Sequence, residues 1–356
     1  MQKKTNGCID MVENSIYRTA LENVVKDIPL SGGRLLVTGA SGLIGSCLID
    51  MLMLANDYGK HFEVYALGRS QQKMAERFSA FVKSPYLHLI EHDIRNPLCL
   101  DIELDYIIHG ASNADPRNYA LYPVETMLIT LDGVYNILEY CKKHMKTRML
   151  LLSTFEVYGN KGIDEYSEVD FGATDINLVR SCYPESKRSA EVLIRCYVQE
   201  YRVNALIARL CSIYGPTMAK DDSKAHAQFI RNALKHENIV LKSKGDQRRT
   251  YCYVIDAVTG LFSVLANGIS GEAYNISYEN SVATIAEVAK TVSEIAGTKV
   301  IFNLPDEVES RGFSVPQNCI LRNEKLRSLG WNGKYSLRRG LEETIKVLSS
   351  IKKNTL

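Results

Sequence analysis

The amino-acid sequence predicts an α/β protein with a doubly wound parallel sheet and a smaller α/β lobe towards its C-terminus. Short aliphatic runs alternate with longer amphipathic segments, and a glycine-rich turn follows the first of these runs. Strand and helix patterns in alternation indicate βαβ units. The aliphatic runs are continuous rather than alternating, which is typical of strands covered on both faces. The expected strands are residues 34–39, 62–67, 87–93, 106–112, 149–154 and 203–210.

The glycine-rich turn, TGASGLIGS, occupies Thr38 to Ser46 between the first expected strand and an apolar helix. Gly39, Gly42 and Gly45 have the spacing that lets a chain turn tightly, approach a pyrophosphate and pack a helix against a sheet. Dinucleotide binding is preferred to a merely structural turn, because strand, turn and helix follow in the required order. The residues expected to contact the dinucleotide here are Gly39, Ser41, Gly42, Leu43, Ile44 and Gly45.

Three parts are expected along the chain. Residues 1–33 form an N-terminal arm, either helical or loose, and residues 34–211 form a dinucleotide-binding domain of the Rossmann type. Further along the alternation loosens, so residues 212–350 are expected to form most of a substrate lobe. One strand from within residues 250–277, near Ala273, is expected to return to the large sheet.

The composition of the chain excludes several classes of protein. The chain has 356 residues, of which 46% are apolar and 24% charged, and this composition is typical of a globular protein. Its net charge of +2 does not favour a nucleic-acid or membrane partner. Nine cysteines without a CxxC pair indicate free thiols in a reducing cytoplasm, and no histidine stands at metal-ligand spacing. No run reaches the roughly 18 apolar residues of a membrane span, so we expect a cytoplasmic protein without an export signal.

The residues after the second expected strand bear on which dinucleotide is bound. An Asp or Glu there accepts hydrogen bonds from the ribose hydroxyls of NAD, whereas this chain has Gly68 and Arg69. No carboxylate repels a 2′-phosphate and Arg69 can pair with it, so NADP(H) is favoured over NAD(H); the alternative is a surface arginine beside a permissive glycine. Asp93 either meets the adenine edge or caps the next turn. Further cofactor contacts are expected at Ile94 and Ala111.

The motif YPESK, Tyr183 to Lys187, opens an amphipathic helix. Residues four apart lie on one helix face with Cβ atoms about 5–6 Å apart, so the Lys187 ammonium can lie near the Tyr183 hydroxyl. Lowering a tyrosine pKa from about 10 to about 7 takes about 4 kcal/mol. One cation at about 4 Å supplies about that much at an effective dielectric constant of about 20. Tyr183 can then exchange a proton with a sugar oxygen while hydride moves to or from a nicotinamide.

The ordered set of motifs resembles that of an extended short-chain dehydrogenase/reductase of the NAD-dependent epimerase/dehydratase family. The resemblance covers residues 34 to 332 and rests on the segments TGASGLIG, HGASNADPRNY, STFEVYG, YPESK, RLCSIYGP, GDQRRTYCYVID, AYNIS and LGW. It implies a Rossmann domain for the dinucleotide, a C-terminal lobe for a nucleotide-diphosphate sugar, and a homodimer joined through two helices from each subunit. It also implies that Thr154 assists Tyr183. Lys187 would hold the nicotinamide ribose, and Arg249 would meet the substrate diphosphate. Further substrate contacts are expected from Ser112, Phe155, Ser212 and Asn275.

Departures from the family pattern bear on the reaction. In the sugar 4,6-dehydratases an Asp-Glu pair follows the threonine, and the two carboxyls divide the acid and base work. Here the first of the two is Phe155, which cannot donate a proton, so the acid for water elimination is lost. The UDP-glucuronate decarboxylases, which HGASNADPRNY and Thr-x-Glu most resemble, carry an arginine directly after Gly-Pro, where this chain has Thr217. Ser212 also replaces the asparagine usual in that loop, which makes diphosphate binding different or weaker.

The residues that remain, Thr154, Tyr183 and Lys187, suffice for transfer of a hydride and a proton. The sequence therefore favours an NADPH-dependent reductase of a nucleotide-activated keto sugar or ketose in surface-polysaccharide synthesis, with Phe155 as an apolar wall beside the sugar. Glu156 either binds a sugar hydroxyl or is a structural acid. The alternative is an epimerase, dehydratase or decarboxylase that retains NAD and uses Glu156 as its base. A third hypothesis, a non-catalytic regulator that senses NADP, is disfavoured by the complete Tyr-Thr-Lys set.

Overall fold

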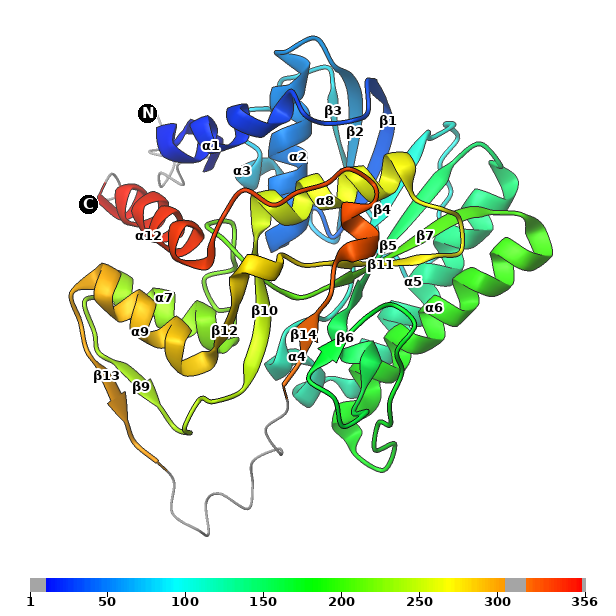
Figure 1. Ribbon diagram of the computed structural model, residues 1–356. Coiled ribbons are helices and arrows are strands. Elements are labelled where there is room, and N and C mark those ends of the chain that lie inside the picture. Colours follow the sequence, from blue (N-terminus) through cyan, green and yellow to red (C-terminus); the bar gives the residue numbers. More distant parts are fainter. Residues whose placement is uncertain (1–10, 305–317, 354–356) are drawn as a thin grey trace.

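The computed structural model describes the chain except for residues 1–10, 305–317 and 354–356. Its centre is a sheet of seven strands in the order β3-β2-β1-β4-β5-β7-β11, all parallel (Figure 1). The strand order reverses between β1 and β4, which is the topology of a doubly wound sheet. The strands are β1 (Gly32–Thr38), β2 (His61–Gly68), β3 (Leu87–Glu91), β4 (Tyr106–His109), β5 (Arg148–Thr154), β7 (Asn204–Leu210) and β11 (Ala273–Ile276).

This architecture confirms the predicted fold class, with differences at the strand ends. Compared with the expected ranges, β1 begins earlier, at Gly32, while β3 stops at Glu91 and β4 stops at His109. Apolar runs locate a strand well but not the residue at which its ladder of hydrogen bonds stops. The AYNIS segment forms β11, which pairs with β7 at the edge of the large sheet.

Helices cover both faces of the sheet, because successive strand residues point to opposite sides. On β1, Leu35 and Val37 pack in one hydrophobic core and Leu36 packs in the other. Helices α1, α2 and α8 cover the first core, and α5 and α6 cover the second (Figure 1). The helices on this sheet are α1 (Ser15–Val25), α2 (Leu43–Asn56), α3 (Gln71–Arg77), α4 (Pro116–Leu121), α5 (Pro123–Lys143), α6 (Cys182–Tyr201) and α8 (Val254–Asn267).

The smaller lobe is formed mainly by the C-terminal part of the chain. One of its sheets has the order β12-β10-β8, and β9 pairs with β13 at the lower left of Figure 1. Strand β10 leads directly into α8, so the lobe is connected to the large sheet by a short path. The elements are β8 (Ser212–Tyr214), α7 (Ala225–Leu234), β9 (Ile239–Leu241), β10 (Arg248–Tyr253), β12 (Val282–Thr284), α9 (Ile285–Ala296), β13 (Val300–Phe302) and α12 (Leu337–Lys353).

Short elements complete the described part of the chain. They are η1 (Met11–Glu13), η2 (Phe155–Tyr158), β6 (Glu165–Tyr166), η3 (Val179–Ser181), η4 (Glu279–Ser281), β14 (Ile320–Leu321) and α11 (Glu324–Arg327). Strands β6 and β14 pair in parallel although they lie far apart in the sequence. Among the described helices, none has both the length and the apolar character needed to cross a bilayer.

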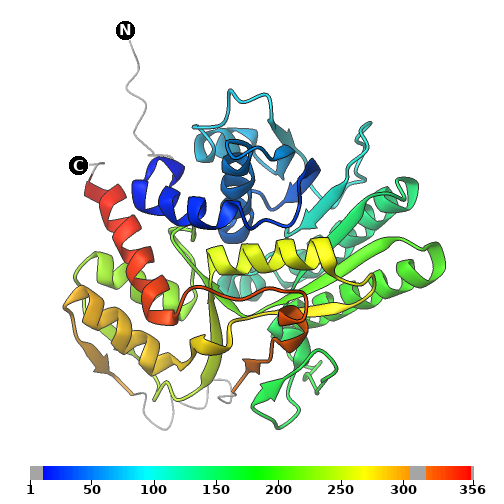
Figure 2. The same cartoon turned by 45° about the horizontal axis from the view of Figure 1, so that its top comes forward.

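The N-terminal arm, expected over residues 1–33, is helical in much of its described part. Asn14 caps α1, since its side chain accepts hydrogen bonds from two backbone N–H groups of the first turn. The Tyr17 hydroxyl donates to Asp50 of α2 at 3.0 Å, and the same carboxylate pairs with Arg77 of α3 at 2.5 Å. Figure 2 shows α1 lying beside α12, with which it is in contact. The described part of the arm is therefore packed on the core of the large domain.

Candidate active site

The glycine-rich turn joins β1 to α2 and requires glycine at two positions. Gly39 has φ +70°, and a Cβ there would lie 2.9 Å from the carbonyl oxygen of Gly110. A Cβ on Gly45 would lie 2.4 Å from the carbonyl oxygen of Gly39. Gly42 is the N-cap of α2 and forms no side-chain cap, so the first N–H groups of the helix remain available to an anion. These features fit the diphosphate of a dinucleotide.

The residues predicted to contact the dinucleotide lie in the turn and the first turn of α2. Ser41 is exposed and Leu43 and Ile44 are half-buried at the start of α2. The hydroxyl of Thr38 accepts hydrogen bonds from the N–H groups of Gly110 and Ala111, both at 3.1 Å. The ends of β1 and β4 are thereby held together below the turn.

His109 is the partner of Thr38 in the core, with Nδ1 2.8 Å from the threonine hydroxyl. Burial and, to a smaller extent, the positive charge of Lys187 lower the pKa of His109 to about 3. His109 is therefore a neutral core histidine that supports the turn.

At the ends of β2 and β3, the predicted cofactor residues have partners within the chain. The Arg69 guanidinium lies 3.4 Å from the Glu125 carboxylate on α5. Asp93 pairs with Arg95 at 2.5 Å and accepts a hydrogen bond from the Arg95 N–H, so it caps the turn after β3. The hydrogen bond from the Arg95 side chain lowers the pKa of Asp93 to about 2. The next residue, Ile94, is buried in the second core.

The three residues expected to handle the proton come together where β5 ends and α6 begins. Thr154 is the last residue of β5, and Tyr183 and Lys187 lie one turn apart on α6. All three side chains are buried, and the Tyr183 ring stacks on Tyr119 with a centroid distance of 5.2 Å. Lys187 Nζ donates a hydrogen bond to the carbonyl oxygen of Leu152 at 2.9 Å. The structure therefore forms a buried group of hydroxyl, phenol and ammonium.

The electrostatics of this group differ from the expectation based on helix spacing. Burial raises the pKa of Tyr183 above its ordinary value, the charge of Glu156 raises it further, and hydrogen bonding with Thr154 opposes the rise. Burial lowers the pKa of Lys187 to about 8, against the attraction of Glu191. The Lys187 ammonium, which donates its hydrogen bond to a strand carbonyl, does not offset this rise of the Tyr183 pKa.

Glu156 lies in η2, the short helix that follows Thr154, and joins the same group of residues. The Thr154 hydroxyl caps η2 by accepting a hydrogen bond from the Glu156 N–H at 3.3 Å. The Glu156 carboxylate pairs with Arg180 at 2.9 Å, and the Arg180 guanidinium lies over the ring of Tyr119. Tyr119 is the stacking partner of Tyr183, so a carboxylate and a guanidinium are part of the surroundings of the phenol.

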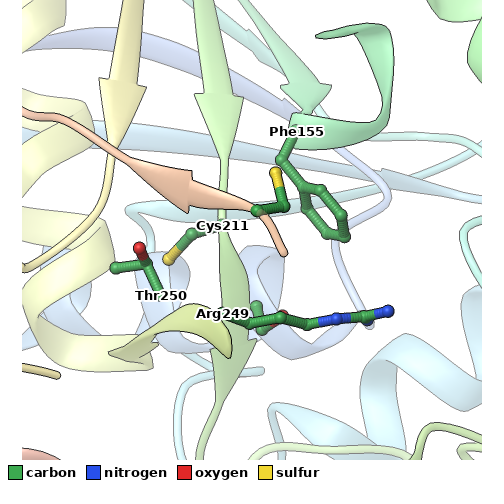
Figure 3. Close-up of a pocket in the computed structure, with 6 residues that line it drawn as sticks. Phe155, Cys211, Arg249 and Thr250 are labelled. Carbon is green, nitrogen blue, oxygen red and sulfur yellow. The ribbon is translucent and has the colours of Figure 1, made fainter. Parts of the chain in front are cut away.

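Phe155, the residue between Thr154 and Glu156, faces a small pocket together with Arg249 (Figure 3). The Arg249 guanidinium lies 5.8 Å from the centre of the phenylalanine ring. Arg249 Nε is buried and has no hydrogen-bond partner among the described residues. A buried unpaired donor favours a ligand that supplies an acceptor oxygen. The pocket is lined by Phe155, Cys211, Ser212, Arg249, Thr250 and Cys319.

Asn275, a predicted substrate contact, is instead enclosed in the core and has no exposed surface. Its Oδ1 accepts a hydrogen bond from the Tyr158 hydroxyl at 2.6 Å. Its Nδ2 donates to the carbonyl oxygens of Tyr166 and Arg322 at 3.2 and 2.9 Å. The side chain therefore joins β11 to the neighbouring loops and does not line the pocket.

Two further residues named from the sequence also bond within the protein. The hydroxyls of Ser112 and Thr130 lie 3.5 Å apart beyond the end of β4. Thr217, at the position of the arginine in decarboxylases, donates to the carbonyl oxygen of Leu43 at 2.7 Å. Thr217 therefore joins the substrate lobe to the glycine-rich turn.

Two residues of the group around Tyr183 were missed by reasoning from the sequence. Tyr119 ends the segment HGASNADPRNY, and Arg180 stands three residues before Tyr183, outside every motif. Helix α4 and η3, which carry them, pack against each other. The basic residue just before YPESK was the available signal, but its partner Glu156 is distant in the sequence.

Comparison with known proteins identifies the family. The model of the NAD-dependent epimerase/dehydratase family matches residues 35–277. The chain belongs to this family. UDP-glucuronic acid decarboxylase 3 from Arabidopsis thaliana is 34% identical over 328 residues, covering 90% of this chain and 91% of that protein. 

Solved structures share the fold. DesIV from Streptomyces venezuelae, a dTDP-glucose 4,6-dehydratase with NAD and TYD bound, superposes with a TM-score of 0.77 at 24% identity, covering 89% of this chain and 97% of that chain. UDP-glucose 4-epimerase from Thermotoga maritima, with UDP-glucose, gives a TM-score of 0.74 at 23% identity, covering 89% of this chain and 99% of that chain. At these identities the structures support the fold alone.

Proposed function

We propose that this protein converts a nucleotide-diphosphate sugar in a redox-neutral reaction, in which a retained NAD oxidises the sugar transiently and the hydride is returned later. The observation that carries the proposal is the place of Glu156: its N–H donates a hydrogen bond to the Thr154 hydroxyl, and its carboxylate pairs with Arg180, whose guanidinium lies over the ring that stacks on Tyr183. A second ionisable group beside the tyrosine suits a reaction with a proton transfer after the oxidation. A simple reductase does not need it.

This proposal replaces the NADPH-dependent reductase that the sequence alone favours. The curated relative is named a UDP-glucuronic acid decarboxylase, and solved structures of a dehydratase and an epimerase share the fold. The sequence alone favours a reductase because Thr154, Tyr183 and Lys187 suffice for it, while Glu156, as either a binder of a sugar hydroxyl or a structural acid, has no part in the proton transfer. With Glu156 in the surroundings of Tyr183, that reason no longer holds.

The residues of the chain divide the work as follows. A bound nicotinamide dinucleotide would supply the hydride acceptor and later the hydride donor. Tyr183 would take the proton from a sugar hydroxyl, and Thr154 would orient that hydroxyl by hydrogen bonding. Lys187 would contribute a nearby positive charge, which favours the tyrosinate. Glu156 would then hold or release the proton of the second step, and Tyr183 would return its proton to the sugar oxygen.

The proposed substrate is a UDP-linked sugar acid. The decarboxylase relative acts on UDP-glucuronic acid by its name, and it matches this chain over most of its length. Arg180, although paired with Glu156, has a half-exposed side chain and could turn to a sugar carboxylate. It would take the place of the arginine that Thr217 replaces. Phe155 opposes water elimination because it cannot act as an acid.

The retained dinucleotide is proposed to be NAD(H). Arg69, the residue that suggested NADP(H), is paired with Glu125, whose negative charge would repel a 2′-phosphate. The observation in favour of NADP(H) is the missing carboxylate after β2. In addition, the exposed Arg69–Glu125 ion pair contributes at most about 1 kcal/mol, so Arg69 can exchange Glu125 for a phosphate. An NADPH-dependent reductase is therefore the second candidate.

The test is to incubate the purified protein, without added dinucleotide, with UDP-glucuronate, UDP-glucose and dTDP-glucose, and to identify the products by mass spectrometry. We expect conversion of UDP-glucuronate by the wild-type protein and none by Tyr183→Phe. Absence of conversion of all three sugars, together with consumption of NADPH on a nucleotide-linked keto sugar, would replace this proposal by the reductase.

We also propose that the protein forms a homodimer through α5 and α6. Both helices carry exposed apolar side chains on their outer surface, which are Val124, Leu128, Tyr135 and Val192. Exposed apolar side chains on two helices that pack together favour a protein interface. Light scattering is expected to give twice the mass of the chain. A charged replacement of Leu128 is expected to reduce that mass to one chain.

A further inference from the structure

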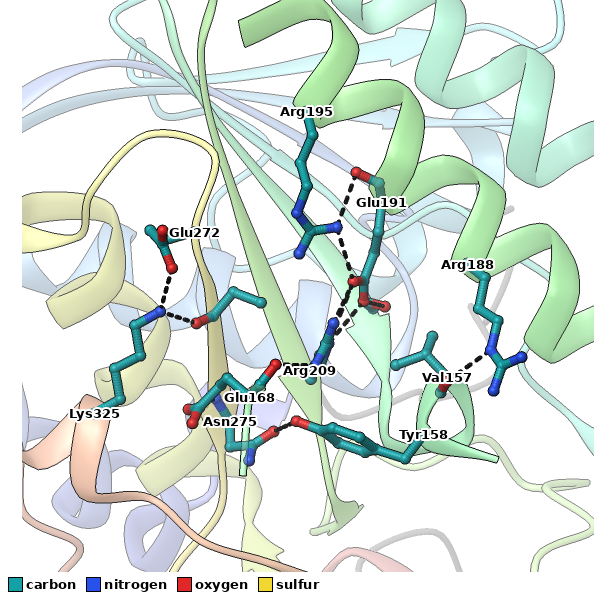
Figure 4. Close-up of polar contacts among 12 residues, drawn as sticks. Val157, Tyr158, Glu168, Arg188, Glu191, Arg195, Arg209, Glu272, Asn275 and Lys325 are labelled. Atoms are coloured by element: carbon teal, nitrogen blue, oxygen red, sulfur yellow. Dashed lines mark hydrogen bonds and ion pairs between the residues drawn. The ribbon is translucent and has the colours of Figure 1, made fainter. Parts of the chain in front are cut away.

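A buried ion pair that the proposed reaction does not use lies behind the proton-transfer group. Glu191 follows Lys187 by one turn on α6, and Arg209 lies on β7 (Figure 4). The Arg209 side chain is 10% exposed and the Glu191 side chain 4%, with Nη2 and Oε2 2.8 Å apart. Because the Arg209 and Glu191 charges are both buried, each would destabilise the fold if it were not paired with the other and hydrogen-bonded.

The Glu191 carboxylate is fixed by partners from three elements. Arg209 Nε also donates to its Oε1 at 3.1 Å, so the guanidinium contacts both oxygens. The Ser153 hydroxyl of β5 donates to Oε1 at 2.7 Å. Arg195, one turn further along α6, contributes a more exposed contact at 3.5 Å. Ser153 directly precedes Thr154, so this hydrogen bond links the Glu191 carboxylate to the end of β5 that carries the catalytic hydroxyl.

Arg209 is fixed on its other side as well. Its Nη1 donates to the carbonyl oxygen of Glu168 at 3.0 Å, and its guanidinium lies 4.8 Å from the centre of the Tyr158 ring. Tyr158 in turn bonds to Asn275, as Figure 4 shows. A guanidinium cannot release its proton at ordinary pH. Arg209 is therefore a fixed positive charge at a fixed place.

Lys187 lies in the field of several described groups. On its own helix it is flanked by Tyr183 and Glu191, and from β4 it faces His109, which burial keeps neutral. Arg209 of β7 stands beyond Glu191. Buried charges interact more strongly than exposed ones, because less water screens them. Glu191 attracts the Lys187 ammonium. Arg209 has the opposite charge and is bound to the same carboxylate, so by Coulomb's law it must oppose that attraction.

We propose that Glu191 and Arg209 are positioning residues that set the charge state of Lys187, with Glu191 holding the ammonium protonated and Arg209 limiting that effect. The importance of that charge for turnover rests on the proposed function. The two charges have opposite signs. Removing the Glu191 charge must therefore lower the titration midpoint of Lys187, and removing the Arg209 charge must raise it. A pair whose charges are too far from Lys187, or too well screened, to act on it would produce no such opposition.

The experiment follows the titration of Lys187 directly by nuclear magnetic resonance of the purified protein labelled with carbon-13 at lysine Cε. The Lys187 signal is assigned by its loss in Lys187→Arg. We expect a lower titration midpoint in Glu191→Gln, which leaves Arg209 uncompensated. We expect a higher midpoint in Arg209→Gln, and a midpoint near the wild-type value in the double variant. Arg195→Gln is the matched control, because it removes a more exposed partner of the same carboxylate.

Shifts in the same direction, or no shift in either single variant, would overturn the proposal. If Arg209→Gln does not fold, the comparison of Glu191→Gln with the double variant decides: the proposal requires a shift in the first that the second reverses. The pH profile of turnover separates the two proposals. If the Lys187 midpoint moves and the profile does not follow, the proposed function fails while the assignment of the ion pair stands.

Discussion

Removal of Arg209 by the substitution Arg209→Met is expected to destabilise the protein strongly. Glu191 would keep a buried carboxylate whose remaining partners are the Ser153 hydroxyl and the distant Arg195. Breaking a buried ion pair by removing one partner costs about 3–5 kcal/mol, since the other charge stays buried. Arg195→Met removes a guanidinium that is 42% exposed and 3.5 Å from the same carboxylate. For such an exposed pair the expected loss is below about 1 kcal/mol.

Urea unfolding of the wild-type protein, Arg209→Met and Arg195→Met measures the difference between the two losses of stability. The slope of the free energy against urea concentration should be the same in all three, so that the midpoints report stability alone. Adding Glu191→Gln to Arg209→Met should recover part of the loss, because no charge is then left buried. Losses from Arg209→Met and Arg195→Met that agree within about 0.5 kcal/mol would refute the reasoning.

Three further predictions concern the active site. Gly45→Ala should yield folded protein purified without dinucleotide, because its Cβ would lie 2.4 Å from the carbonyl oxygen of Gly39; absorbance of the purified protein checks this. The rate of the first oxidation, followed by nicotinamide absorbance, should fall as pH rises through about 8, where Lys187 loses its proton; a flat profile there would contradict it. Arg180→Met should raise the KM for UDP-glucuronate by at least tenfold, on the order of 1.4 kcal/mol, and leave the binding of a neutral UDP-sugar unchanged.

Much of the fold could be predicted because its signals are local. The apolar runs are strands covered on both faces, and the glycines of the turn must approach the backbone of Gly39 and Gly110. The YPESK motif lies at the start of a helix, and Tyr183 and Lys187 of this motif lie near Thr154 at the end of β5. Each of these features depends on residues close together in the sequence.

The parts of the site that could not be predicted depend on contacts between distant segments. Spacing along α6 placed Lys187 near Tyr183, but the carbonyl oxygen of Leu152 takes its hydrogen bond. Asn275 was expected to bind substrate, yet its side-chain amide forms hydrogen bonds with three neighbouring segments of the protein. The ion pair of Glu156 with Arg180 connects residues on either side of β6, and no periodic sequence pattern predicts such a contact.

The same limitation explains the change in the preferred reaction. From the sequence, Phe155 in place of an acid indicates that the acid for elimination is lost, and Glu156 either binds a sugar hydroxyl or is a structural acid. In the structure, Phe155 packs beside Arg249, while the charge of Glu156 acts on Tyr183. The acidic group that a redox-neutral reaction needs is therefore present, although its usual neighbour is absent.

The most direct test of the central claim is to identify the dinucleotide released from denatured, freshly purified protein, and to count its moles per mole of chain. A redox-neutral enzyme that keeps its cofactor should release NAD or NADH in about equal amount to the chain, and the undenatured sample should convert UDP-glucuronate without any addition. An empty protein that binds NADPH more tightly than NADH, and turns over only while NADPH is consumed, would contradict the account.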